Sequence, residues 1–134
     1  MLASFRKSIS SLDAVFAFVG TGLDELQIPR EASFAAQLAI EELFTNMVKY
    51  GCQTDDEVGI SLRRDVNRLV VELTEQADIP FDPTGAPDVD LSLPLTERKV
   101  GGLGIHLIRS LIDEMSYTHR HGQSRITLIK NLEL

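Results

Sequence analysis

Apolar residues recur every three or four positions in two stretches of the first fifty residues, a spacing typical of helices with one buried face. A short extended segment, 3–9, precedes them. The first helix begins at 10–11, and its predicted buried face consists of Leu12, Val15, Phe16 and Val19. The second begins between residues 29 and 33 and ends at Gly51, and its predicted core stripe consists of Ala36, Ile40, Leu43, Phe44 and Met47.

The middle of the chain changes to a strict alternation of apolar and polar residues. This alternation covers 57–64 and 68–74 on either side of a short turn, which predicts two antiparallel strands. The pattern then dissolves over 78–100, where four of the chain's five prolines prevent a regular helix or a central strand.

The last third of the chain predicts one more helix and a closing hairpin. The helix covers 103–115 behind a glycine cluster, and the hairpin pairs 116–121 with 125–131 around Gly122-Gln123. The order β-α-α-β-β-loop-α-β-β predicts an α+β fold, a two-layer sandwich with helices on one face of a largely antiparallel sheet.

Composition narrows the function classes. The length of 134 residues corresponds to one domain. Thirteen basic against 20 acidic residues give a net charge of −7, which disfavours direct contact with nucleic acid or anionic lipid. A single cysteine, Cys52, excludes an intrachain disulfide framework. No apolar run approaches the roughly 20 residues of a membrane span, so we expect a cytoplasmic protein.

The second predicted helix carries a carboxylate and an amide one turn apart. Glu42 and Asn46 share a helix face with two alanines and Lys49, which leaves room for a ligand. A carboxylate can accept a proton from a hydroxyl, an asparagine oxygen can ligate Mg²⁺, and a lysine can meet a phosphate. Taken alone, such a pair is more often a solvated helix side.

The glycine cluster is a second candidate for phosphate binding. Gly101, Gly102 and Gly104 precede a predicted helix, so backbone N–H groups could approach phosphates without obstruction by a Cβ. Arg98, just upstream, could contact phosphate oxygens. The spacing fits neither a Walker A loop nor a dinucleotide fingerprint, and a simple glycine hinge is an equally good interpretation in isolation.

Several motifs follow one another in an order that carries more information than any one of them. They are Glu42-Leu-Phe-Thr-Asn46, Pro80-Phe-Asp-Pro83, Glu97-Arg98, Gly101-Gly-Leu-Gly-Ile105, Leu111-Ile-Asp113, Tyr117 and Thr127-Leu-Ile-Lys130. This ordered set resembles the anti-sigma regulatory factor Ser/Thr kinases, a branch of the GHKL (histidine-kinase-like) ATPase superfamily. The resemblance implies a single ATPase domain over 1–134, a Bergerat-type sandwich with a lid at about 80–102.

The resemblance also implies roles for residues. Glu42 corresponds to the general base and Asn46 to the Mg²⁺ ligand of a protein kinase that uses ATP, while Thr127 corresponds to a residue near the adenine. The residues expected at the nucleotide are Asn46, Lys49, Gln76, Asp78, Pro80, Arg98, Gly101, Gly102, Leu103, Gly104 and Thr127. The implied partners are a STAS-type antagonist and a sigma factor, and the implied assembly is a homodimer.

One motif departs from the family. Gln76 and Asp78 stand where the family pattern D-x-G-x-P-F has its adenine-binding Asp and its Gly. A glutamine carbonyl can still accept a hydrogen bond from the adenine amino group, but the loss of charge costs about 1.5–3 kcal/mol. The sequence therefore predicts weakened ATP binding, with two alternatives: a register slip that makes Asp78 the adenine-binding acid, or a protein-binding module that has lost nucleotide binding.

Overall fold

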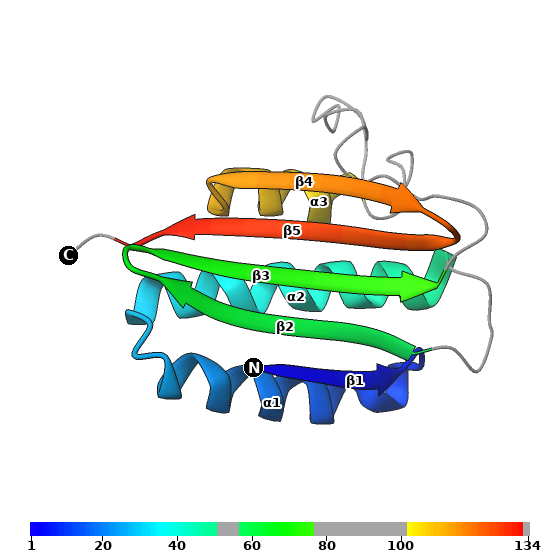
Figure 1. Ribbon diagram of the computed structural model, residues 1–134, viewed down its shortest axis with the longest axis horizontal. Coiled ribbons are helices and arrows are strands. Elements are labelled where there is room, and N and C mark those ends of the chain that lie inside the picture. Colours follow the sequence, from blue (N-terminus) through cyan, green and yellow to red (C-terminus); the bar gives the residue numbers. More distant parts are fainter. Residues whose placement is uncertain (51–56, 77–101, 133–134) are drawn as a thin grey trace.

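Five antiparallel strands form one sheet, and the helices cover one of its faces (Figure 1). The computed structural model describes residues 1–50, 57–76 and 102–132. The elements are β1 (Leu2–Arg6), η1 (Ile9–Ser11), α1 (Leu12–Glu25), α2 (Arg30–Tyr50), β2 (Glu57–Asp65), β3 (Arg68–Gln76), α3 (Gly102–Leu111), β4 (Glu114–Arg120) and β5 (Gln123–Asn131). The strand order is β1-β2-β3-β5-β4, and the predicted two-layer α+β sandwich is confirmed.

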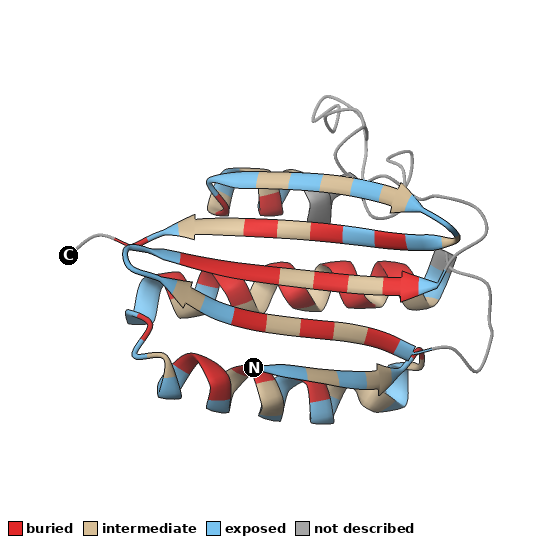
Figure 2. Ribbon diagram, viewed as in Figure 1, coloured by how far each residue is buried: buried red, intermediate tan, exposed pale blue. Residues whose placement is uncertain are grey.

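The core lies between the sheet and α2, the central helix, which contacts both α1 and α3. Strand β2 and the second half of β3 alternate between buried and less buried residues (Figure 2), because successive side chains of a strand point to opposite faces. In the first half of β3, Leu69, Val70 and Val71 are all buried. The predicted core stripe of α2 is confirmed, since all five of its residues are buried. Among the described helices, none combines the length and the apolarity that crossing a membrane requires.

We expect Phe44→Ala to destabilise the protein by about 3–5 kcal/mol, because Phe44 is fully buried and its removal leaves a cavity. Phe34 on the same helix is 66% exposed, so Phe34→Ala should change the free energy of unfolding by less than about 0.5 kcal/mol. Urea unfolding of the two variants measures both values. Equal losses would contradict the assignment of Phe44 to the core.

The buried face of α1 differs from the predicted one at Phe16, which is 38% exposed. Phe18 takes the aromatic position instead, with its ring 5.6 Å from that of Phe5 on β1. Gly22 extends the buried face, because a Cβ there would lie 2.7 Å from Leu62 Cδ1 of β2. Close approach of α1 to the sheet therefore sets which residues of the helix are buried, and periodicity alone does not fix that rotation.

The helix α3 ends at Leu111 rather than at the predicted Met115. The Asp113 backbone N–H donates to Ile129 O at 3.0 Å, and the Asn131 N–H donates to Asp113 Oδ2 at 2.7 Å. These bonds tie the chain to β5, so the next residues enter β4. Pairing with a neighbouring strand overrides the helical periodicity of that segment.

Candidate nucleotide-binding site

Polar side chains gather at one end of the sandwich, on the face of the sheet that carries the helices. The inward row Ile60, Leu73 and Ile126 is apolar and belongs to the core. Two residues further along the strands, the inward positions on β3, β5 and β4 are Glu75, Ser124 and His119, which are neighbours across the sheet. We call these three residues the polar row.

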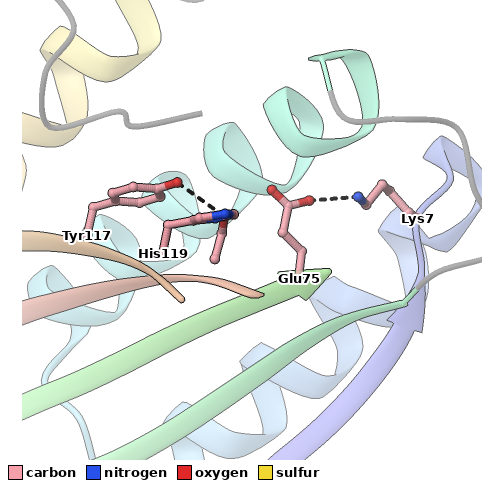
Figure 3. Close-up of polar contacts among 5 residues, drawn as sticks. Lys7, Glu75, Tyr117 and His119 are labelled. Atoms are coloured by element: carbon pink, nitrogen blue, oxygen red, sulfur yellow. Dashed lines mark hydrogen bonds and ion pairs between the residues drawn. The ribbon is translucent and has the colours of Figure 1, made fainter. Parts of the chain in front are cut away.

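Hydrogen bonds fix Ser124 in the polar row. Its side-chain oxygen lies 2.9 Å from His119 Nδ1 and 3.2 Å from the Tyr117 hydroxyl, and Ser124 is buried. Tyr117 and His119 project from β4 toward this point (Figure 3). The hydroxyl is thus held between two polar partners on the neighbouring strand, and His119 is half-buried.

A buried ion pair lies beside the polar row. Lys7 follows β1, and its Nζ lies 2.7 Å from Glu75 Oε2 (Figure 3), with the two side chains 1% and 6% exposed. Neither atom has a hydrogen-bond partner among the described residues, so the ion pair is their polar contact there. Two charges in such surroundings are stabilised mainly by one another, because water cannot solvate them.

The C-terminal end of α2 lies at the same end of the sandwich (Figure 1) and carries Asn46. Asn46 is 4% exposed, and its Nδ2 finds no hydrogen-bond partner within the described ranges. A buried amide donor without an acceptor is costly, so a polar group is expected beside it. A ligand oxygen or an ordered water would satisfy this donor.

The helix α2 brings Glu42 and Asn46 together as predicted, one turn apart, with Glu42 half-buried. Ala35 and Ala39, predicted on the same face, are buried. Lys49 is exposed, so its side chain does not share their buried surroundings. The helix contacts α3, whose first turn contains Gly102, Leu103 and Gly104.

A magnesium ion fits this arrangement only if the protein and a bound polyphosphate both supply its ligands. Among the described residues, no group of three or more His, Cys, Asp or Glu could hold a metal. Mg²⁺ bound through phosphates needs only one or two protein oxygens, and the Asn46 amide can supply one when its oxygen faces the ligand. The donor set therefore suits Mg²⁺ that arrives with a polyphosphate.

Two predicted site residues lie on the opposite face of the sheet. Gln76 is exposed and points away from the face on which Glu75 lies, because the side-chain period of a strand is two. Thr127 alternates with the buried Ile126 and Leu128 and therefore also faces outward. The structure does not bring Gln76 or Thr127 to the face that carries Asn46.

The inward polar positions were detectable in the strand pattern. In the alternating segment 68–74, the apolar residues Leu69, Val71 and Leu73 share one face, and continuing this period of two reaches Glu75. The same continuation from Leu128 and Ile126 reaches Ser124. The family motif, aligned on Pro80-Phe81, predicts Gln76 as the adenine-binding residue instead. The ion pair between Glu75 and Lys7 could not be predicted from local sequence, because 68 residues separate the partners.

The remaining predicted site residues, Asp78, Pro80, Arg98 and Gly101, lie outside the described residues, as does most of the predicted lid. Cys52 also lies outside them.

Comparisons with known proteins place the chain in a family. The model of the histidine kinase-like ATPase domain matches residues 5–130. The RsbU and RsbW domains of Rv1364c from Mycobacterium tuberculosis share the fold, with a TM-score of 0.65, 17% identity, and coverage of 98% of this chain and 32% of that chain. This chain thus spans about a third of the length of that protein.

The histidine kinase AdeS from Acinetobacter baumannii matches with a TM-score of 0.54 and 14% identity, over 100% of this chain and 68% of that chain. A search of the curated proteins gives no match. At these identities the two solved structures establish the fold alone, whereas the family model covers nearly the whole sequence. The chain belongs to the histidine kinase-like ATPase domain family.

Proposed function

We propose that the protein binds Mg²⁺-ATP beside the C-terminal half of α2 and transfers the γ-phosphoryl group to a Ser or Thr hydroxyl of a partner protein, as an anti-sigma-type kinase. The observation that carries this proposal is Asn46, a buried amide whose Nδ2 has no partner in the described part of the chain, one turn from the half-buried Glu42. The family match and the ordered motifs support it.

Each residue has a role in this proposal. Glu42 accepts the proton of the attacking hydroxyl. The Asn46 Nδ2 donates to a phosphate oxygen, and the Asn46 Oδ1 orients the ion that accompanies the phosphates. Bound Mg²⁺ neutralises negative charge on the phosphoryl oxygens. Arg98 and the glycines 101–104 contact the phosphates from the predicted lid, which is the part of the proposal that rests on the sequence.

The partner class follows from the same resemblance. We propose a STAS-type antagonist as the phosphorylated protein, a sigma factor as a second binding partner, and a homodimer as the working assembly. The likeness to a chain that includes an RsbW domain is compatible with a regulatory role of this kind. ATP and a sigma factor both belong to the cytoplasm, so we expect the protein to act there.

Titration with Mg²⁺-ATP in a calorimeter tests nucleotide binding. We expect saturable binding by the wild-type protein and a loss of about 10-fold or more in affinity for Asn46→Ala, because the amide that orients the ion is removed. Gln37→Ala is the matched control, since it removes an amide of the same helix that faces Gly20 of α1. Absence of binding by folded wild-type protein at millimolar ATP would contradict the proposal.

A second function is a protein-binding module that does not use nucleotide. The ion pair between Lys7 and Glu75 favours it, because the inward-facing acid of β3 is already engaged. This alternative predicts a partner affinity that ATP does not change. A partner affinity that varies with ATP excludes it.

A further inference from the structure

The polar end of the sandwich contains an acid that neither the family motif nor the predicted site residues identified. Glu75 continues the inward face of β3, beside Ser124 and in line with the core residue Leu73. Its carboxylate is therefore on the helix-bearing face, at the end of the sandwich where α2 carries Asn46. We take the base of a nucleotide held by Asn46 to lie near this polar row, and this step rests on the proposed function.

One carboxylate oxygen of Glu75 is already paired in the structure. The Lys7 ammonium lies 2.7 Å from its Oε2, and both side chains are almost completely buried. Unpaired, the carboxylate would be a buried charge without solvation, so Lys7 is the group that makes its burial tolerable. Any other donor to Oε2 has to compete with this ammonium.

Lys7 is attached in a way that permits exchange. The pairing of β1 with β2 ends at Arg6, so the Lys7 backbone lies just beyond the ladder. Lys7 precedes the 3-10 helix η1. The hydrogen bond from the Ser8 N–H to Arg6 O, at 2.8 Å, spans Lys7. The four-carbon side chain of lysine can change rotamer while the strand remains paired.

We propose that Lys7 is a built-in competitor for the nucleotide base: its ammonium occupies the Glu75 carboxylate, and nucleotide binding exchanges this ion pair for a hydrogen bond from an exocyclic amino group of the base. The exchange is a change of noncovalent partners, in which an N–H donor of the base replaces an N–H donor of lysine. Lys7 thereby lowers nucleotide affinity, and Glu75 restricts binding to bases that present an amino group.

Calorimetric titration of Lys7→Met with ATP tests the competitor. We expect this variant to bind ATP roughly 10-fold or more tightly than the wild type, because a charged acceptor is freed for the base. Arg6→Met is the matched control, since it removes a positive charge from the neighbouring exposed position and should leave the affinity unchanged or slightly lower. Lys7→Met/Glu75→Leu should lose the gain.

The ligand supplies a second control. Inosine triphosphate carries a carbonyl oxygen where adenine carries the amino group, so it offers Glu75 no donor at that position. We expect Lys7→Met to gain affinity for ATP and not for inosine triphosphate. An equal gain for the two nucleotides would show that Lys7 excludes ligands without regard to the amino group, which overturns the role given to Glu75.

The outcomes separate this inference from the proposed function. ATP binding by the wild type with equal or weaker binding by Lys7→Met overturns the inference and leaves the function standing. No ATP binding by any folded variant overturns the proposed function. If thermal unfolding shows that Lys7→Met does not fold, Lys7→Gln replaces it. The glutamine keeps a neutral donor for Glu75, and we expect an affinity above that of the wild type; an affinity at or below the wild type overturns the inference.

Discussion

Glu42→Gln is expected to slow phosphoryl transfer by about 10²- to 10⁴-fold, the usual contribution of a positioned general base. The glutamine keeps the size of the side chain but cannot accept the proton. ATP binding should change by less than about threefold, because the nucleotide is proposed to contact Asn46 and the phosphate-binding segments rather than this carboxylate. Release of ADP by the protein alone measures the rate, with water in place of the partner hydroxyl, and calorimetry measures the binding.

The neighbouring Glu41 provides the control, since it is a half-buried carboxylate of the same helix turned by about 100° from Glu42. Glu41→Gln should retain the rate of the wild type. The two variants have the same net charge, so a difference between them reports position rather than charge. Equal rates for Glu42→Gln and the wild type would remove Glu42 from the chemistry.

Lys7→Met is expected to lower the free energy of unfolding by about 3–5 kcal/mol, because it leaves the Glu75 carboxylate buried without a counter-charge. The double variant Lys7→Met/Glu75→Leu should recover most of this loss or exceed the wild type, since apolar residues replace both charges. Chemical unfolding of the wild type, both single variants and the double variant gives the coupling energy. A domain of ordinary stability, about 5–15 kcal/mol, remains folded with the single change.

A surface ion pair serves as the comparison. Arg63 and Glu72 lie 3.9 Å apart on neighbouring strands, and the Arg63 side chain is 61% exposed. Arg63→Met should cost less than about 1 kcal/mol, because solvent screens the pair. If Lys7→Met costs no more than Arg63→Met, the buried pair between Lys7 and Glu75 does not form in solution.

The stability of the Lys7→Met variant and its affinity for ATP are linked, because both depend on the Glu75 carboxylate. The energy that Lys7 supplies to the folded protein is the energy that a nucleotide has to replace when it binds at Glu75. A variant without Lys7 is therefore expected to be less stable without ATP and more strongly stabilised by it, since a ligand that binds only the folded state raises its stability. Thermal unfolding with and without ATP connects the two measurements.

Residue periodicity was sufficient for strands β2 to β5 and for the core of α2. The predicted extended segment 3–9 was too long, because β1 ends at Arg6 and Ile9 begins the 3-10 helix η1. The stripe that includes Ile40 and Phe44 is buried as the spacing predicts, because helix and strand periods are local properties of the backbone. Periodicity was insufficient at Phe16 and at the end of α3. There the contacts of α1 with β2 and of Asp113 with β5 decide the outcome, and these contacts join segments that are distant in the sequence.

The sequence by itself determined the order of the helices and strands, the apolar faces of β2 and β3, and the pairing of Glu42 with Asn46 on one helix. Only the tertiary structure decided which acid lies on the helix-bearing face beside the polar row, and that Lys7 holds it. The physical reason is that a buried charge is located by the partner that stabilises it, and here that partner comes from the segment after β1, 68 residues away along the chain.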